Sequence, residues 1–453
     1  MKGYHYIKRG IDIILSGMAI VILSPLLLFL CIAIKLDTPG PILFKQKRVG
    51  IHRSFFQIYK FRTMRICSDY SSDISTLIGL KGNDTLFIST WNKDEEILPF
   101  PENKVTEYNK LHQYEVNQYF FSDEFINLKE NIVSENIEFK KYRISSSNFM
   151  FMSNGTLAAW LCILTILNEK KNLNVLLLSP IYYIYIEILK HLDAKIYVES
   201  AYDINYAKIA SIIKSKGINL VILNNPLFGT GVCLSNEEIV KIQTLLSNNE
   251  GFLLIDNIYN GLKWHSELFV NDFKLYTSLS SFDNFFILES LAKNLFLNGT
   301  KHCSIFSNSK WIDKLEKYSV FFSGSITAQQ YNFIKKLYSS KEHQFIITQL
   351  KKNVNYAQKN YTFLKGLLGG KNVQLSNCES GTYCLLGIPR KIFNAQDDLL
   401  IAQEIMQKCN ILTLPHDRYL YYNEQYYCFR INLMIDQQTL FDFISILQKC
   451  LNF

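Results

Sequence analysis

The sequence contains few of the residues that interrupt regular structure, with nine prolines and twenty glycines among 453 residues. Tyrosine and phenylalanine are abundant by contrast, with 27 and 32 copies. A chain this rich in aromatic side chains can bury enough apolar surface to fold, so extensive disorder is excluded. Its length leaves room for two or three domains.

The sequence also lacks any clustering of its ten cysteines. No two of them form a CxxC pair, and no group of cysteines and histidines has the spacing of metal ligands. This pattern excludes a disulfide framework, and we expect no bound metal ion. Scattered, reduced thiols are typical of a protein that faces the cytosol.

An excess of positive over negative charge is missing from most of the chain and is concentrated at its start. The net charge is +8, and residues 1–65 contain eleven lysines and arginines but only Asp12 and Asp37 as acids. The rest of the chain is therefore close to neutral. Because these basic residues flank one long apolar run, they favour contact with anionic lipid headgroups, and we expect no nucleic-acid partner.

That apolar run extends from Ile11 to Ile34 and is long enough to span a bilayer. Lysine and arginine flank both of its ends, whereas a spanning helix is basic mainly on its cytoplasmic side. Ser24-Pro25 interrupts its middle, because proline lacks the N–H that a helix needs. These features favour a helix that enters the membrane and returns. A single spanning helix remains the alternative, while a cleaved signal peptide is disfavoured by the length of the run.

Three stretches at the start of the chain carry a resemblance: KRGIDIILSGMAIVILSP, PGPILFKQKRVG and FFQIYKFRTM. They resemble the opening of the bacterial sugar transferases, the monotopic phosphoglycosyl transferases, from Tyr4 to about Met64. The resemblance implies a re-entrant helix at the cytoplasmic face of the inner membrane, with residues 1–65 in contact with lipids. Enzymes of that family transfer a sugar phosphate from a nucleotide sugar to a polyprenyl phosphate.

The chemistry of that family depends on an Asp-Glu pair, followed by a Val-Gly-Pro-Arg-Pro segment that binds phosphate. Asp94 and Glu95, in KDEEILPF, lie at a plausible distance from the membrane element. Their surroundings differ from the family motif, and no Val-Gly-Pro-Arg-Pro segment occurs in the chain. We therefore interpret residues 1–66 as a truncated anchor. A phosphoglycosyl transferase remains an alternative that requires Asp94 and Glu95 to act.

Beyond a polar connector, short apolar runs alternate with helical stretches. The runs have the length of strands, and they are LNVLLLS, AKIYVES, INLVILNN, GFLLIDN and FFILES. Such alternation predicts an α/β fold with a mostly parallel sheet and helices on both faces. In these sheets ligands bind at the carboxyl ends of the strands, so the residues after each run form the candidate site.

Polar and aromatic residues follow several of these runs. GFLLID ends at Asp256 and is followed closely by Tyr259, and LNVLLLS is followed by Tyr182. Gly155-Thr156 opens a helical run, and such an N-terminus is suited to bind phosphate through its backbone N–H groups. Each of these residues taken alone is also compatible with a cap or with ordinary packing.

Lys293 is the most informative position, because it stands among small and apolar residues in ESLAKNLFLNG, just after FFIL. A lysine there loses hydration, and its pKa is expected to fall. Such a lysine either extends to solvent or acts as a nucleophile. A desolvated amine, a carboxylate, an aromatic ring and a phosphate-binding N-terminus at neighbouring strand ends together match the needs of pyridoxal phosphate (PLP).

From about residue 110 to Phe453 the chain resembles the fold type I aminotransferases of the aspartate aminotransferase-like group. The resemblance implies pyridoxal 5'-phosphate as cofactor. It also implies a PLP-binding large domain over 110–330 and a small C-terminal α/β domain over 331–453, preceded by a linker over 67–109. That fold makes its active site between two subunits, so a homodimer is implied.

By the same resemblance, Lys293 bonds covalently to the cofactor, Asp256 pairs with its ring nitrogen, and Tyr259 contacts its ring oxygen. Arg430, in YYCFRINL, binds the α-carboxylate of the substrate through its planar fork. The remaining family positions for cofactor binding fall on Gly155, Thr156, Tyr182, Asn225, Ser290 and Lys301.

Four positions depart from the family pattern. Phe228, in NPLFGTG, replaces the asparagine that donates to the ring oxygen, and Lys301 replaces an arginine that binds the phosphate with two N–H groups. Ala292 stands where a hydroxyl residue is common, and His416 stands where a glycine is usual. We expect weaker phosphate binding from the loss of the arginine.

These observations predict a membrane-associated, PLP-dependent aminotransferase. Its substrates are expected to be an α-amino carboxylate or related amino donor and a small-molecule acceptor. The front segment suggests a role in envelope glycan biosynthesis. A PLP lyase or decarboxylase on the same scaffold, a phosphoglycosyl transferase and a catalytically degenerate, membrane-anchored scaffold remain alternatives.

Overall fold

The computed structural model describes residues 85–89, 99–111, 122–265, 273–323 and 326–452, together with two strands and several isolated positions before residue 80. The chain divides into two compact units, Met1–Gly79 and Leu80–Phe453. Every residue predicted to bind cofactor or amino substrate lies in the second unit.

The first unit contains an antiparallel pair of strands, β1 (Leu43–Val49) and β2 (Phe55–Phe61). The first residue of β1 lies opposite the last residue of β2, so the strands are in full register. Most of the predicted membrane run lies outside the described residues, but Ser24 and Pro25 are both helical. No helix within the described part is long and apolar enough to cross a membrane. The choice between a re-entrant and a spanning helix stays a prediction.

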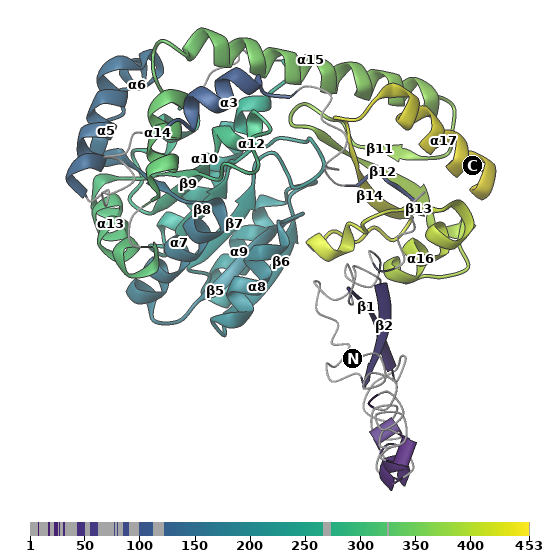
Figure 1. Ribbon diagram of the computed structural model, residues 1–453. Coiled ribbons are helices and arrows are strands. Elements are labelled where there is room, and N and C mark those ends of the chain that lie inside the picture. The colour runs from purple at the N-terminus through teal and green to yellow at the C-terminus, as the bar shows by residue number, and fades with distance from the viewer. Residues whose placement is uncertain are drawn as a thin grey trace. The chain divides into compact units, whose positions relative to one another are not determined.

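A seven-stranded sheet forms the centre of the second unit (Figure 1). Its strand order is β4-β10-β9-β8-β7-β5-β6. Of these seven strands, β10 alone runs opposite to the other six, so the mostly parallel α/β fold is confirmed. The strands are β4 (Phe149–Met152), β5 (Asn174–Ser179), β6 (Lys195–Ser200), β7 (Leu220–Asn224), β8 (Phe252–Asp256), β9 (Phe285–Glu289) and β10 (Cys303–Phe306).

The central strands are continuous apolar runs because helices cover both faces of the sheet. All residues of β7, β8 and β9 are buried, whereas β6, at the edge of the sheet, is at least partly exposed throughout. Each of the three central strands carries its polar residue at its last position: Asn224, Asp256 and Glu289. The apolar requirement of the core therefore places the polar groups at the carboxyl ends.

Helices surround this sheet (Figure 1). Several begin after a side chain that caps the first backbone N–H groups, such as Asn154 before α7 and Ser235 before α10. The helices of this part are α3 (Glu102–Tyr108), α5 (Ser122–Glu135), α6 (Ile137–Lys141), α7 (Gly155–Lys170), α8 (Tyr183–His191), α9 (Tyr206–Lys216), α10 (Asn236–Ser247), α11 (Lys274–Leu279), α12 (Leu291–Asn294), α13 (Ser309–Ser323) and α14 (Ala328–Leu337).

A smaller antiparallel sheet, β11-β12-β14, supports the C-terminal part. The long helix α15 (His343–Leu368) bridges the two parts of the unit (Figure 1). The amide of its Asn353 donates to the carbonyl of Asn294 at 2.9 Å, and the amide of its Asn360 donates to the carbonyl of Leu433 at 2.8 Å. The other elements are β11 (Gln374–Leu375), β12 (Tyr383–Pro389), α16 (Asp398–Cys409), β13 (Ile411–Leu412), β14 (Tyr426–Asn432) and α17 (Gln437–Leu451).

The predicted linker over 67–109 contains regular structure in its second half. β3 (Leu86–Phe87) pairs in parallel with β13, more than three hundred residues along the chain. The phenol of Tyr108, in α3, donates to the carboxylate of Glu342 at 2.9 Å. Both elements are short and depend on distant partners, so the local sequence gave no signal for them. The domain boundaries themselves stay predictions.

Candidate active site

The predicted catalytic residues follow adjacent strands of the central sheet. Asp256, at the end of β8, lies opposite Asn224 of β7 on one side and Leu288 of β9 on the other. The chain leaves β9 through Ser290 and enters α12, which carries Lys293. The parallel register therefore brings the carboxylate and the amine to the same edge of the sheet.

Asp256 is a buried carboxylate, 6% exposed. The phenol of Tyr185 donates to it at 3.0 Å, and the backbone N–H of Ile258 donates at 3.4 Å. Burial raises its pKa to about 6, although these hydrogen bonds and Lys293 oppose the shift. The sequence did not point to Tyr185, although it lies in α8 only three residues after Tyr182, the residue that precedes this helix.

The side-chain amine of Lys293 has no hydrogen bond or ion pair among the described residues, and the residue is solvent-exposed. The protein around it still removes part of its hydration, and this desolvation lowers its pKa. The positive charges of Lys301 and Arg430 lower it further, while Asp256 opposes the shift. Lys293 is therefore an accessible amine that loses its proton more readily than an ordinary lysine.

The start of α7 offers backbone N–H groups to an anion. The side chain of Asn154 accepts from the N–H of Leu157 at 2.9 Å, while the N–H groups of Gly155 and Thr156 have no acceptor among the described residues. A Cβ atom on Gly155 would lie 3.0 Å from the Ile258 side chain. Free N–H groups at the positive end of a 16-residue helix fit a phosphate.

Ser290 and Lys301 lie at the same edge of the sheet as the start of α7. Ser290 follows the end of β9 and Lys301 shortly precedes β10, which runs antiparallel between β4 and β9. The amide of Gln330 donates to the carbonyls of Ser153 and Lys301, at 3.1 and 2.7 Å. The Ser290 hydroxyl donates its single hydrogen to the carbonyl of His302 at 2.8 Å. Ser290 is thus near the predicted phosphate position, but its hydrogen is already used.

Arg430, on β14, presents an unpaired cation. Its Nε donates to the carbonyl of Ser89 at 2.5 Å, and no ion pair joins it to an acid among the described residues. The guanidinium lies over the ring of Tyr383, 4.8 Å from the centroid, and over that of Phe228 at 5.3 Å. Its terminal nitrogens can still donate hydrogen bonds to a carboxylate.

Aromatic rings form one side of the site. Tyr182 stacks on Phe228 with 5.2 Å between the ring centroids and 30° between the planes. Phe228 also lies 4.6 Å from Tyr419. The phenylalanine that replaces the family's asparagine is thus part of an aromatic wall. Burial raises the phenol pKa of Tyr259. The positive charge of Arg430 lowers this pKa, and the negative charge of Asp256 raises it.

Two further residues hold the loop that follows β7. Asn225 receives the N–H of Leu234 at 2.9 Å and donates to the Leu234 carbonyl at 3.3 Å, so its amide closes the loop. His416 bonds through Nε2 to the carbonyl of Phe228 at 2.9 Å. Burial, followed by the charge of Arg430, lowers the pKa of His416 to about 3, so the ring is neutral.

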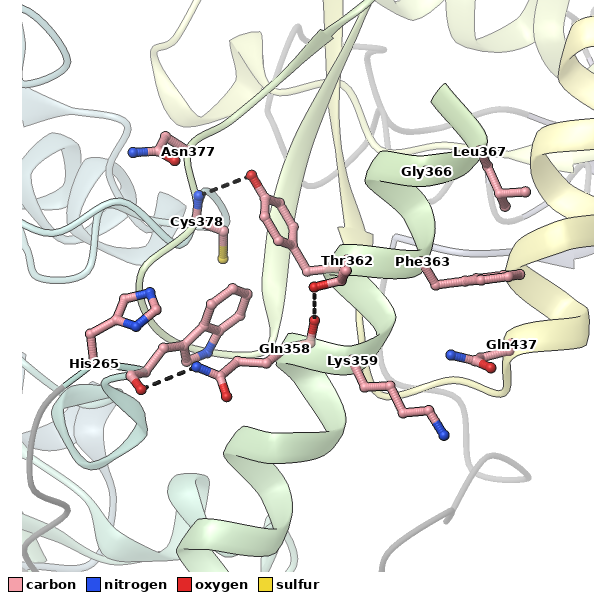
Figure 2. Close-up of a pocket in the computed structure, with 12 residues that line it drawn as sticks. His265, Gln358, Lys359, Thr362, Phe363, Gly366, Leu367, Asn377, Cys378 and Gln437 are labelled. Atoms are coloured by element: carbon pink, nitrogen blue, oxygen red, sulfur yellow. Dashed lines mark hydrogen bonds between the residues drawn. The ribbon is translucent and has the colours of Figure 1, made fainter. Parts of the chain in front are cut away.

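A separate hollow of about 900 Å³ lies between α15 and the loop around Trp264 (Figure 2). Its wall includes His265, Gln358, Phe363 and Cys378. None of the predicted site residues contributes to it. The hollow is therefore a different feature from the group around Lys293.

The geometry defines a class of protein: an α/β enzyme with a free lysine, a buried carboxylate and an anion-binding helix start. Two family models match the chain, one for aminotransferase class I and II at residues 94–447 and one for bacterial sugar transferase at residues 3–100. The first match covers most of the chain, and the chain belongs to the class I and II aminotransferases. Members of that family are PLP-dependent transferases.

Curated relatives match the front of the chain. UDP-N-acetylgalactosamine-undecaprenyl-phosphate N-acetylgalactosaminephosphotransferase from Aeromonas hydrophila is 51% identical over 61 residues, which is 14% of this chain and 14% of that protein. Exopolysaccharide production protein PSS from Rhizobium leguminosarum bv. phaseoli is 51% identical over 59 residues, 13% of this chain and 30% of that protein. The chain thus spans less than a third of either relative.

Solved structures match the body of the chain. A single mutant of Thermus thermophilus aspartate aminotransferase has a TM-score of 0.71 at 14% identity, covering 86% of this chain and 98% of that one. The methionine aminotransferase YbdL from Escherichia coli has a TM-score of 0.67 at 14% identity, covering 84% and 97%. A PLP-bound C-S lyase from Staphylococcus hominis has a TM-score of 0.66 at 15% identity, covering 83% and 90%.

These likenesses show the fold, and they confirm the expected fold type I architecture. Both expected family resemblances are confirmed as well. The roles of the individual residues stay predictions, although the structure brings Lys293, Asp256 and Arg430 into one electrostatically coupled group. Asp94 and Glu95 lie outside the described residues.

Proposed function

We propose that this chain is a membrane-associated aminotransferase that uses PLP to move an amino group from an α-amino carboxylate to a small-molecule acceptor. One observation carries the proposal. Within the described part of the chain Lys293 is an amine without a hydrogen bond or ion pair, its pKa is lowered, and it is coupled electrostatically to a buried carboxylate, Asp256, at the end of the adjacent strand. Few structural roles require an accessible lysine to remain unpaired beside a buried acid.

The residues present fit the cofactor. The free N–H groups of Gly155 and Thr156, together with Lys301, would hold its phosphate, and Asp256 would hold a proton on its ring nitrogen. PLP, when bound, supplies an aldehyde and an electron-accepting ring. Tyr185 steadies Asp256 through its hydrogen bond of 3.0 Å.

The substrate side is served by other residues. Arg430 would bind the α-carboxylate through its free terminal nitrogens, and this contact would fix the orientation of Cα. Lys293 Nζ would then accept the proton from Cα and hold it, because a lysine with a lowered pKa can act as a base near neutral pH. Tyr182 and Phe228 would exclude water from one side.

The front segment extends the proposal to the membrane. Residues 1–65 hold all of the excess positive charge of the chain. We infer that they attach the enzyme to the cytoplasmic face of the inner membrane, that the enzyme works as a homodimer, and that its product enters envelope glycan biosynthesis. The sugar-transferase family match and the names of the front-segment relatives support the membrane attachment and the role in glycan biosynthesis. The aminotransferase family match supports the homodimer.

Reaction with borohydride tests the core of the proposal. Reduction of the PLP-loaded full chain should fix the cofactor covalently to Lys293, as located by mass spectrometry of tryptic peptides, and the Lys293→Ala protein should carry no such adduct. A screen of amino donors with keto-acid detection then tests the transfer itself. Release of carbon dioxide or thiol without amino transfer would replace the aminotransferase by a decarboxylase or lyase, and a wild-type chain without adduct would refute PLP chemistry.

A further inference from the structure

Two segments of the chain separate at the proposed phosphate position. β4 and β10 pair antiparallel, and Met152, the last residue of β4, lies opposite Cys303, the first residue of β10. Beyond this pair the ladder ends, because the chain after β4 enters α7 and the chain before β10 carries Lys301. The start of α7 and Lys301 therefore lie on segments that strand pairing no longer joins, and other groups must set the distance between them.

A single carboxamide bridges the two segments. Gln330, in the first turn of α14, donates through Nε2 to the carbonyl of Ser153 at 3.1 Å and to the carbonyl of Lys301 at 2.7 Å. These two bonds account for both hydrogens of the amide nitrogen. Ser153 directly precedes Asn154, which caps α7. One side chain thus holds both sides of the proposed phosphate site.

The cap of α14 does not by itself explain a glutamine at this position. The N–H of Thr327 donates to Oε1 of Gln330 at 3.2 Å, and the N–H of Gln330 donates to the Thr327 hydroxyl at 3.1 Å, which together form a capping box. A glutamate would complete the same box, because only the side-chain oxygen takes part. The amide nitrogen is the group that glutamine adds, and its two printed bonds both lead to the phosphate site.

A second group fixes the backbone beside Lys301. The hydroxyl of Ser290, at the end of β9, donates to the carbonyl of His302 at 2.8 Å. Two successive carbonyls, those of Lys301 and His302, are therefore held by side chains from different elements. With its backbone fixed in this way, the exposed Lys301 can adjust to an anion only through its side chain.

We infer that Gln330 is a positioning residue for the cofactor phosphate. Its carboxamide sets the distance between Lys301 and the free N–H groups of Gly155 and Thr156, and it acts through these groups. The inference rests on the proposed function, since that proposal places the phosphate at the start of α7.

Anion binding by the cofactor-free full chain tests the inference. PLP binding is followed by visible absorbance, and inorganic phosphate binding by the rise in unfolding temperature. Gln330→Glu keeps the volume and the capping box but removes both N–H donors. It should raise the dissociation constants of PLP and of phosphate about 5-fold, the lower end of the range for a hydrogen bond lost from a partly shielded site. The neutral variant Gln330→Met should give a loss of the same order.

Two neighbouring positions provide matched controls. Gln329→Glu adds the same charge in the same helical turn, but its amide bonds to Asn109, 2.9 Å away in an exposed contact, and both dissociation constants should stay within about two-fold of wild type. Thr327→Val removes the capping hydroxyl and keeps the carboxamide. It should lower the unfolding temperature while the affinity for phosphate is retained.

The outcomes separate positioning from general stability and charge. Unchanged dissociation constants in both Gln330 variants would overturn the inference. An equal loss of affinity in Thr327→Val would overturn it as well and assign the effect to the helix cap, and an equal loss in Gln329→Glu with none in Gln330→Met would assign it to charge.

Phosphate binding also separates this inference from the proposed function. Phosphate affinity that depends on Gln330, in a chain that forms no PLP adduct, would retain the positioned anion site and reject the aminotransferase. A borohydride-fixed adduct at Lys293, with phosphate and PLP affinities insensitive to both Gln330 variants, would reject the positioning role alone.

Discussion

The two units of this chain show two different kinds of similarity to known proteins. The front segment is 51% identical to a curated relative, but over 61 residues. The body matches a solved aminotransferase over 86% of the chain, but at 14% identity. A short segment proposed to contact lipid is constrained by which residues it carries, whereas a large core is constrained mainly by where its apolar residues fall. We therefore expect the proposed membrane attachment and the proposed amino transfer to be separable.

The largest expected effect concerns the body alone. Lys293→Ala should abolish amino transfer, a loss on the order of 10⁴-fold or more, because no other described group replaces its amine. Binding to lipid vesicles should not change. Amino transfer measured with the best donor checks the loss of activity, and vesicle flotation of the same protein checks that lipid binding is unchanged. Retained amino transfer would remove Lys293 from the mechanism.

The second prediction concerns the front segment alone. Joint replacement of Lys45, Lys47 and Arg48 by glutamine should weaken binding to anionic vesicles on the order of 100-fold, since each basic residue near a membrane contributes about 1 kcal/mol. The effect should diminish with added salt. Amino transfer in solution should be unchanged, as measured by parallel kinetic assays and flotation.

Neutralisation of three lysines in the body provides the matched control. Lys351, Lys352 and Lys371 are exposed, and their joint replacement by glutamine changes the net charge equally. If this control protein binds vesicles as weakly as the front-segment variant, then total charge rather than its concentration at the start of the chain governs attachment.

The third prediction uses the pKa of Asp256. Burial holds this pKa at about 6, above the ordinary value of 3.8, so the folded cofactor-free chain binds the proton more tightly than the unfolded chain does. This contribution to the free energy of unfolding is complete below about pH 4 and is lost as the pH rises through 6, on the order of 2–3 kcal/mol. Asp256→Asn should remove it.

Urea unfolding of the cofactor-free protein between pH 4 and pH 7 checks that prediction. Burial also raises the pKa values of Asp398 and Asp417, to about 7 and about 6. The informative quantity is therefore the difference in the free energy of unfolding between wild type and Asp256→Asn at each pH. The pH dependence of either protein alone is not informative. Parallel curves for the two proteins would mean that the carboxyl is not desolvated.

The smallest expected effect concerns Lys301. Lys301→Arg should slow the loss of PLP by a few-fold, because a planar guanidinium can give a phosphate two N–H groups where an ammonium acts as a point charge. Cofactor retention after dialysis, followed by absorbance, measures it. Faster loss of PLP would place Lys301 away from the phosphate, and Lys301→Met serves as the neutral control.

Much of the candidate site could be predicted by taking the residues that follow apolar runs of strand length. Apolar runs of strand length identified β5, β7, β8 and β9, and the residues after them included Asp256 and Lys293. The structure places both residues at one edge of the sheet, because parallel strands bring their carboxyl ends together. The approach failed for Tyr185, whose partner lies 71 residues away, and for β3, whose partner strand is more distant still.

The sequence by itself determined the α/β class, the basic start and the identity of the candidate lysine, because each depends on local composition and periodicity. Only the tertiary structure decided that β10 runs antiparallel between β4 and β9, and that Arg390 is buried in an ion pair with Asp398. Burial and pairing depend on which distant segments pack together, and no local pattern encodes that outcome.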